Sequence, residues 1–147
     1  MEKILKQAYE KAKTARDHAY TPYSGFNVGA AIVTADEQRI YSGCNVENAS
    51  YGATICAERT ALLTAISAEG ISKLKLQTTN HDIFSFLIVV AETESPTPPC
   101  AQCLQVLSEF CGAGFPIYLA NTKRILKKIT FAELLPFPFN GVSLQKQ

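Results

Sequence analysis

Apolar and polar residues recur with a helical period at the start of the chain. Residues 1–19 place apolar side chains on one face and Lys and Glu on the other, which predicts an amphipathic helix that ends at Thr21-Pro22. Two runs rich in Val, Ile and Tyr follow at residues 26–34 and 39–44, joined by the polar residues 35–38. These two runs predict an antiparallel β-hairpin.

The middle of the chain changes from a helical pattern to a continuous apolar one. Residues 55–68 have apolar side chains at helical spacing and stop near Gly70, as expected of a helix followed by glycine. Residues 84–91 form an unbroken apolar run, which is typical of a central strand covered on both faces. Pro98 and Pro99 are expected in the first turn of a second helix that reaches about residue 110.

The remaining pattern completes a layered α/β arrangement. Residues 116–120 predict another strand, residues 131–135 a last short helix, and residues 71–83 an exposed connection. Because helices and strands alternate in the second half, we expect right-handed crossovers and helices on both faces of a mixed sheet. The predicted fold class is a three-layer α/β/α sandwich, with a mixed sheet of the five-stranded type.

Composition narrows the class of protein. The chain has 147 residues, 47% of them hydrophobic and 18% charged, and a net charge of +1, so residues 1–147 are expected to form one domain and not a nucleic-acid binder. No signal or membrane segment is visible, which favours a soluble, cytoplasmic protein that does not bind membranes. A solvated helix or loop face accounts for the one basic cluster, made of Lys123, Arg124, Lys127 and Lys128.

Cysteine spacing is the most informative feature of the sequence. Cys100 and Cys103 form a C-x-x-C at a helix start, a spacing that serves both metal ligands and redox pairs. Cys56 begins the other crossover helix, so the three thiols are expected at one edge of the sheet, where ligands bind in open α/β sheets. Cys44 and Cys111 are interpreted as small buried hydrophobic residues.

Three converging thiolates with one open position describe a catalytic zinc site. A water in the open position would become a nucleophile at neutral pH, and Glu58, two residues after Cys56, is placed to shuttle its protons. Arg59 can donate hydrogen bonds to the thiolates and offset their charge. The alternative for Glu58 and Arg59 is an exposed pair of charges at a helix terminus.

Several segments resemble the small, homotetrameric cytidine deaminases. The likeness runs from the first helix to Leu134-Leu135-Pro136. It includes the zinc-deaminase signature, in which a ligand stands two residues before a Glu and P-C-x-x-C follows. The segments that carry the resemblance are Pro22-Tyr23-Ser24-Gly25-Phe26, Val28-Gly29-Ala30-Ala31, the residues from Gly43 to Tyr51, Cys56-Ala57-Glu58-Arg59-Thr60-Ala61, and Pro99-Cys100 with Cys103, Gln105 and Val106.

The resemblance implies an activity and a set of binding residues. It implies zinc-dependent hydrolytic deamination of cytidine and 2′-deoxycytidine in pyrimidine salvage, with one Zn²⁺ per subunit and Glu58 as proton shuttle. It further implies that Phe26 packs on the base, that Asn45 and Glu47 bind the ribose hydroxyls, and that the Ala57 backbone fixes the base. A homotetramer with shared active sites is implied, in which Tyr51 and Phe139 come from a neighbouring subunit.

The chain departs from the family pattern after the second cysteine of C-x-x-C. Leu104 stands where the family usually has Arg, so one positive charge near the thiols is missing. The cysteines are separated by Ala101-Gln102 in place of the usual small residues, and the connection between Cys56 and Cys100 is longer than usual. Neither of these last two changes replaces a predicted ligand.

Other functions remain open on the sequence. A nucleic-acid deaminase would need a basic, aromatic cradle, and a non-catalytic zinc or redox domain would not need Glu58. A cysteine hydrolase would need a histidine partner for Cys56, but His18 and His81 lie outside every motif. A deaminase of another small aminopyrimidine or of a modified nucleoside would keep the zinc and Glu58, whereas intact Phe26, Asn45 and Glu47 favour a nucleoside.

Overall fold

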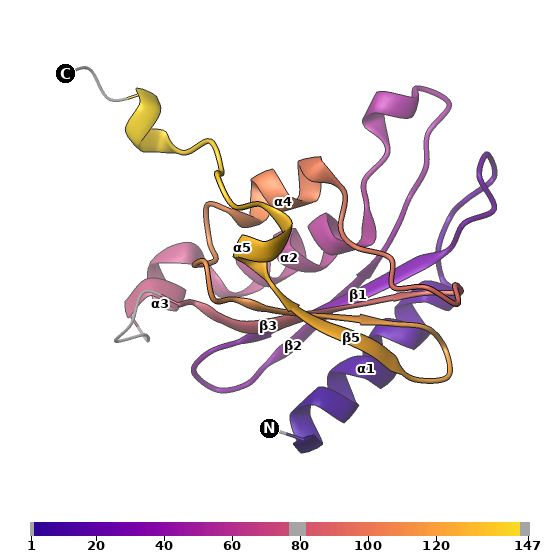
Figure 1. Cartoon of the computed structure of the whole chain (residues 1–147), viewed down its shortest axis with the longest axis horizontal. Coiled ribbons are helices and arrows are strands. Elements are labelled where there is room, and N and C mark those ends of the chain that lie inside the picture. Colours follow the sequence, from indigo (N-terminus) through magenta and orange to yellow (C-terminus); the bar gives the residue numbers. More distant parts are fainter. Residues whose placement is uncertain (1, 77–81, 145–147) are drawn as a thin grey trace.

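A five-stranded sheet in the order β2-β1-β3-β4-β5 forms the middle of the molecule, seen in a computed structural model (Figure 1). The model describes residues 2–76 and 82–144. Only β3 and β4 pair in parallel, and the other neighbours are antiparallel, so the sheet is mixed as predicted. The strands are β1 (Val28–Thr34), β2 (Ile40–Cys44), β3 (Phe84–Ala91), β4 (Pro116–Ala120) and β5 (Ile125–Thr130).

Helices cover both faces of this sheet, which confirms the three-layer prediction. Figure 1 shows α1 on one side, and α2, α4 and α5 on the other. The helices are α1 (Glu2–Asp17), α2 (Ala57–Glu69), α3 (Ile71–Leu76), α4 (Ala101–Leu107) and α5 (Phe131–Leu134), with 3-10 turns η1 (Tyr51–Ala53) and η2 (Gly141–Leu144). Among the described residues, no helix has the length and apolar character needed to span a membrane.

Strand β3 separates two hydrophobic cores. Phe84, Leu87 and Val89 pack with α2 and α4, whereas Phe86, Ile88 and Val90 pack with α1. Successive side chains of a strand point to opposite faces, so a strand buried on both sides must be apolar throughout. The central position of β3 therefore explains the continuous apolar run in the sequence.

Helix α2 lies directly against β2 at Gly43. A Cβ atom on Gly43 would come within 2.6 Å of the backbone nitrogen of Ala61 and 2.7 Å of the Thr60 side chain. No side chain fits there without moving backbone, so glycine is required for this close approach. The contact holds the end of β2 at a fixed distance from the start of α2.

The C-terminal end of α2 is held by a cluster of charged and polar side chains. The Glu69 side chain is 4% exposed and accepts a 2.7 Å hydrogen bond from the Lys73 ammonium. It also accepts one from the Tyr41 hydroxyl and forms an ion pair with Arg39. Hydrogen bonding from Lys73, followed by Tyr41 and Arg39, lowers the pKa of Glu69 to about 2. This cluster ties α2 to the hairpin and to α3.

Two helix predictions are wrong in their details. Pro98 and Pro99 do not lie in the first turn of a helix but precede its N-cap, Cys100, and the helix ends at Leu107 and not near residue 110. Ile55 is not helical, because it pairs with Val46 in an isolated β-bridge. Both differences bring the cysteines to the N-caps of α2 and α4.

Two elements were not predicted. The prediction of a solvated helix or loop face holds for Lys123 and Arg124, which lie exposed between β4 and β5, but Lys127 and Lys128 lie exposed on β5, at the edge of the sheet. Exposed lysines are common on edge strands, where they discourage pairing with other chains. The predicted connection at residues 71–83 begins with α3 and buries Leu74, whereas residues 77–81, including His81, lie outside the described residues.

Candidate metal centre and active site

The N-termini of α2 and α4 bring three thiols together. Cys56 and Cys100 are the N-cap residues of the two helices, and Cys103 lies in the first turn of α4. The Sγ atoms of Cys56 and Cys100 are 3.8 Å apart, and those of Cys100 and Cys103 are 3.6 Å apart. All three sulfurs lie within 4.8 Å of one another. The predicted meeting of the three thiols at one edge is confirmed.

The spacing of these sulfurs fits a tetrahedral zinc site. Zn–S bonds of about 2.3 Å at tetrahedral angles hold two sulfurs about 3.8 Å apart. The Cys56–Cys100 and Cys100–Cys103 separations are close to this value without any rearrangement. Cys103 is buried and Cys100 is exposed, so the cluster has a protein side and an open side. Three soft ligands and an open side are what a catalytic zinc requires.

Glu58 lies beside the thiols on the first turn of α2. The residue is buried, with an exposed fraction of 5%, and its Oε2 atom is 3.9 Å from the Sγ of Cys103. Burial raises the pKa of Glu58 to about 7, and the negative charge of Cys56 acts in the same direction. The alternative interpretation of Glu58 as an exposed terminal charge is therefore wrong.

Arg59 supplies a positive charge to the cluster. Its Nη2 atom donates to the Cys56 sulfur at 3.5 Å and to the Thr54 carbonyl at 3.3 Å. Hydrogen bonding from the Cys103 thiol, with a further contribution from Arg59, lowers the pKa of Cys56 to about 5. The same shared proton raises the pKa of Cys103. Cys56 is thus held in an environment that favours its thiolate.

Residues 2–118, which include all three thiols, match the family model described as the cytidine and deoxycytidylate deaminase zinc-binding region. The cytidine deaminase of Sporosarcina psychrophila is 45% identical over 134 residues, which cover 91% of this chain and 90% of that protein. The chain belongs to the cytidine deaminase family. The domain is that of a hydrolase acting on C–N bonds, and the thiol cluster of this deaminase can hold the zinc for which the region is named.

Further relatives of the deaminase agree in sequence and in structure. The cytidine deaminase of Halalkalibacterium halodurans is 44% identical over 138 residues, covering 94% of this chain and 92% of that protein. A crystal structure of cytidine deaminase from Burkholderia pseudomallei superposes with a TM-score of 0.77 at 40% identity, covering 91% of this chain and 98% of that one. The cytidine deaminase of Mycobacterium tuberculosis gives 0.70 at 34% identity, with coverages of 92% and 97%.

The segment around Val46 brings the predicted sugar-binding residues next to the metal centre. Val46 and Ile55 exchange backbone hydrogen bonds of 2.9 and 3.0 Å, and Ile55 directly precedes Cys56. Asn45 and Glu47 flank Val46 and make backbone hydrogen bonds to Tyr20. Asn45 and Glu47 lie outside every cysteine motif in the sequence. The bridge between Val46 and Ile55 nevertheless brings their segment next to the residue that precedes Cys56. Ala57 follows as the first, fully buried residue of α2.

Asn45 and Glu47 have structural partners that the sequence did not reveal. The Asn45 amide accepts a 2.9 Å hydrogen bond from the Val28 backbone and donates one of 2.7 Å to the Phe26 carbonyl. One carboxylate oxygen of Glu47 accepts hydrogen bonds from the backbones of Tyr23 and Ser24, at 3.0 and 3.1 Å. Hydrogen bonding from Ser24, through its side chain and then its backbone, lowers the pKa of Glu47. Both side chains thus fix the loop that carries Phe26.

The predicted aromatic residues lie on the surface. Phe26 is 41% exposed, Tyr51 75% and Phe139 58%, so Phe26 is not buried in the strand core. The Tyr51 ring packs edge-on against Tyr23, with ring centroids 5.7 Å apart. Among the described residues, no hydrogen bond joins Tyr51 or Phe139 to the thiol cluster.

The other two cysteines lie outside the cluster. Cys44, at the end of β2, and Cys111 are half-buried, so their interpretation as small buried hydrophobic residues is partly right. Cys111 packs against the core under α2 and α4, and burial raises the pKa of its thiol. His18 is exposed at the end of α1 and lines a shallow surface hollow with Cys44, not with Cys56. Nothing in the described residues pairs a histidine with Cys56.

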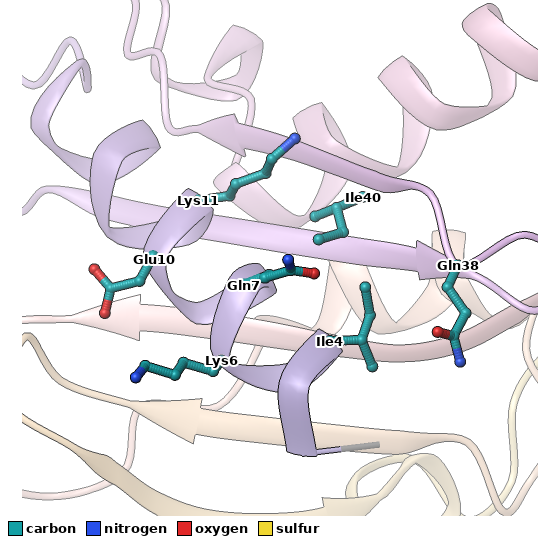
Figure 2. A pocket seen from close by; sticks show the side chains of 7 residues that line it. All are labelled: Ile4, Lys6, Gln7, Glu10, Lys11, Gln38 and Ile40. Carbon is teal, nitrogen blue, oxygen red and sulfur yellow. The ribbon is translucent and has the colours of Figure 1, made fainter.

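A separate hollow lies between α1 and the β1–β2 turn (Figure 2). Figure 2 shows its polar side chains spread around the rim, with two isoleucines between them. The hollow contains no thiol and no paired acidic groups, and it opens beside α1, on the opposite face of the sheet from α2 and α4. It is not part of the metal centre. Its lining residues are Ile4, Lys6, Gln7, Glu10, Lys11, Gln38 and Ile40.

Proposed function

We propose that this chain deaminates free cytidine and 2′-deoxycytidine to uridine and 2′-deoxyuridine, with release of ammonia, using Cys56, Cys100 and Cys103 as the zinc ligands. The observation that carries the proposal is the buried Glu58 carboxyl, 3.9 Å from the Cys103 sulfur in a cluster of zinc-like spacing. A structural zinc site is closed by four protein ligands and has no need of a buried carboxyl beside it. A hydrolytic site requires both the open position and the acid.

Glu58 moves the protons of the reaction. Zinc, when bound, would act as a Lewis acid that makes water nucleophilic at neutral pH. Glu58 accepts a proton from the attacking water and gives it to the ring nitrogen as the C4–O bond forms. It then takes the second proton from the C4 hydroxyl and gives it to the amino group, so that the C4–N bond breaks as the C4=O bond forms, and ammonia leaves. Its burial suits this role, because a general acid and base works best with a pKa near the working pH.

The substrate is held from the hairpin side of the metal centre. Phe26 packs on the base, and the Ala57 backbone, at the free N-terminus of α2, fixes its polar edge. The loop contacts leave one amide hydrogen of Asn45 and one carboxylate oxygen of Glu47 available for further hydrogen bonds. These two atoms bind the ribose hydroxyls. A ligand without hydroxyls would leave these groups unpaired, which disfavours its binding.

A homotetramer completes the active sites. Tyr51 and Phe139 are exposed in the single chain, and we assign them to the site of a neighbouring subunit. Exposed apolar side chains on and beside α2 offer an interface: Val46 is 45% exposed, Ile55 36% and Leu63 49%, and all three line one surface groove. Contiguous apolar surface of this kind marks protein contacts. Size-exclusion chromatography with light scattering tests the assembly, and a monomeric enzyme with full activity would contradict it.

The setting of the enzyme follows from its thiols. The described structure contains five free cysteines, and three of them must stay reduced to bind zinc. A reducing compartment meets this need, so we propose a cytoplasmic enzyme of pyrimidine salvage. One sheet with two helical layers supports treating residues 1–147 as one domain. The reaction takes small-molecule nucleosides and involves neither nucleic acid nor membrane.

The deciding experiment adds cytidine to the purified, zinc-loaded protein and follows the ultraviolet change and ammonia release. Turnover is expected in the wild type, and Glu58→Ala should lower kcat by about 10²- to 10⁴-fold or more with zinc retained. Zinc content and thermal melting of the variant show that it is folded and loaded. Absence of turnover by the loaded wild type would refute the proposal and redirect the search to another aminopyrimidine or to a non-catalytic role. Oligonucleotide substrates in the same assay test the nucleic-acid alternative.

A further inference from the structure

The chain beyond α5 exposes aromatic side chains on a stiff segment. Phe137 is 92% exposed and Phe139 58%, and Pro136 and Pro138 precede them. Each proline fixes its backbone φ and removes a hydrogen-bond donor, so the segment is rigid but poorly anchored by its own backbone. Figure 1 shows it running past α4 and away from the sheet. Something other than packing must therefore determine where Phe139 lies.

One side chain of α4 anchors this segment. The Nε2 atom of Gln105 donates a 2.8 Å hydrogen bond to the backbone carbonyl of Phe139. Gln105 is two residues beyond Cys103, on the helix that carries two of the thiols. This hydrogen bond ties residues 136–139 to α4. Its partners are 34 residues apart in the sequence.

Ser108 holds the Gln105 side chain in place. Its hydroxyl donates a 2.6 Å hydrogen bond to the Gln105 backbone carbonyl, and its oxygen lies 3.4 Å from Nε2 of the same residue. Only the amino side of an amide can donate to a carbonyl, so the contact with Phe139 also fixes which way the Gln105 amide faces. Both side-chain hydrogen bonds of Gln105 use Nε2, so together they fix the position of this atom.

We propose that Gln105 is a positioning residue that sets the Phe139 ring for the pocket of a second copy of this chain. The inference rests on the proposed function, in which Phe139 belongs to the site of a neighbouring subunit. The hydrogen bond holds the backbone of Phe139 and leaves the ring turned outward and exposed. Because α4 carries Cys100 and Cys103, the helix that binds metal in one copy also places the ring that closes the pocket of the next.

Gln105→Glu tests the contact with little change in side-chain size, because a carboxylate cannot donate to the Phe139 carbonyl. Loss of one such hydrogen bond predicts a rise in KM for cytidine of about 3- to 10-fold, with kcat and zinc content nearly unchanged. Gln102→Glu is the matched control: it makes the same change on the same helix, at an exposed residue with no hydrogen-bond partner among the described residues.

A double-mutant cycle separates positioning from a merely structural effect. In a Phe139→Ala background, Gln105→Glu should change KM no further, because the ring that it positions is gone. An equal change of KM in both backgrounds would overturn the proposal. So would an unchanged KM in Gln105→Glu, provided that Phe139→Ala itself raises KM.

A fluorescence experiment tests the same contact without substrate. The chain contains no tryptophan, so Phe139→Trp provides a single reporter. Adding Gln105→Glu should shift its emission to the red and increase quenching by acrylamide, whereas adding Gln102→Glu should do neither. Unchanged emission would contradict the positioning role even in a protein that deaminates cytidine. Failure of the wild type to turn over cytidine, with the emission shift present, would instead refute the proposed function alone.

Discussion

Helix α2 carries a buried glutamate at each end, and the two behave in opposite ways. Glu58 in the first turn is 5% exposed, and its pKa is raised to about 7. The Glu69 side chain in the last turn is 4% exposed, and its pKa is lowered to about 2. The helix dipole alone would do the reverse, because it favours negative charge at the N-terminus and disfavours it at the C-terminus.

The partners of each carboxylate explain the difference. Glu69 meets a lysine, an arginine and a tyrosine hydroxyl, all of which favour its charged form. Glu58 faces sulfur, and the one guanidinium close by, that of Arg59, is hydrogen-bonded to Cys56 and Thr54. Burial without a dedicated cation keeps a carboxyl ready to exchange protons, whereas burial among cations turns it into a fixed anion. We therefore expect changes at the first end to affect zinc and turnover, and changes at the second to affect stability.

The largest effect is expected from Cys103→Ser. Removal of the buried thiol leaves two sulfurs for the metal, so zinc content should fall to a small fraction and turnover with it by about 10³-fold or more. Metal analysis by mass spectrometry and the ammonia assay measure both. Cys44→Ser changes a half-buried thiol outside the cluster and should retain zinc. Full zinc occupancy in Cys103→Ser would contradict the expectation that changes around Glu58 and the thiols affect zinc binding.

Arg59→Ala should weaken zinc binding by about 10- to 100-fold, as loss of a hydrogen-bond partner to a metal ligand commonly does. Leu104 is apolar and 6% exposed, so it cannot replace the missing charge. A chelator competition titration gives the affinity, and the thermal melt of the zinc-loaded variant should change little. Unchanged zinc affinity and unchanged turnover in Arg59→Ala would show that the thiolates need no cation.

Glu69→Gln should lower Tm by a few degrees at neutral pH and leave zinc content unchanged. The folded pKa of about 2 lies below the ordinary value of 4.5, so the stabilisation is complete above about pH 4.5 and disappears as pH falls through 2. The Tm difference from wild type should therefore shrink across this window. Melting curves at several pH values measure it, and a difference that persists at pH 2 would show that the charge of Glu69 is irrelevant.

The smallest effect is expected from Tyr41→Phe, which removes one hydrogen bond to Glu69 while Arg39 and Lys73 remain. Tm should fall by less than in Glu69→Gln, and kcat should not change. The ratio of the two Tm shifts shows how much of the stabilisation comes from the hydroxyl. Loss of zinc in Tyr41→Phe would mean that the two ends of α2 are not independent.

The metal centre could be predicted from the sequence because each of its halves is local. Cys56 with Glu58 and the C-x-x-C each lie at a helix start, and the predicted crossover topology brings the two helix starts to the same edge of the sheet. The edge strand β5 could not be predicted, because the adjacent residues Lys127 and Lys128 resemble a solvated surface. They are exposed on an edge strand with one strand neighbour, β4.

The contacts of the proposed substrate-binding residues could not be predicted, because no sequence pattern indicates them. Gln105 bonds to the backbone of Phe139, and a backbone carbonyl is present at every position. Asn45 braces Phe26 and Val28 across the hairpin, a contact that is visible only once the register of the strands is known. The resemblance indicated Asn45 as a ligand for sugar, but only the structure shows it as a support for the loop that carries Phe26.

The close approach at Gly43 has a consequence for the choice of substrate. The backbone of Gly43 packs against the backbone of α2, so the distance between the metal centre and the hairpin, which carries Asn45 and Glu47, is fixed. For a nucleoside bound as proposed, the fixed distance between the two regions determines how far the sugar can lie from the ring. A nucleoside analogue lengthened by one methylene between base and sugar would reach only one of its two anchors at a time.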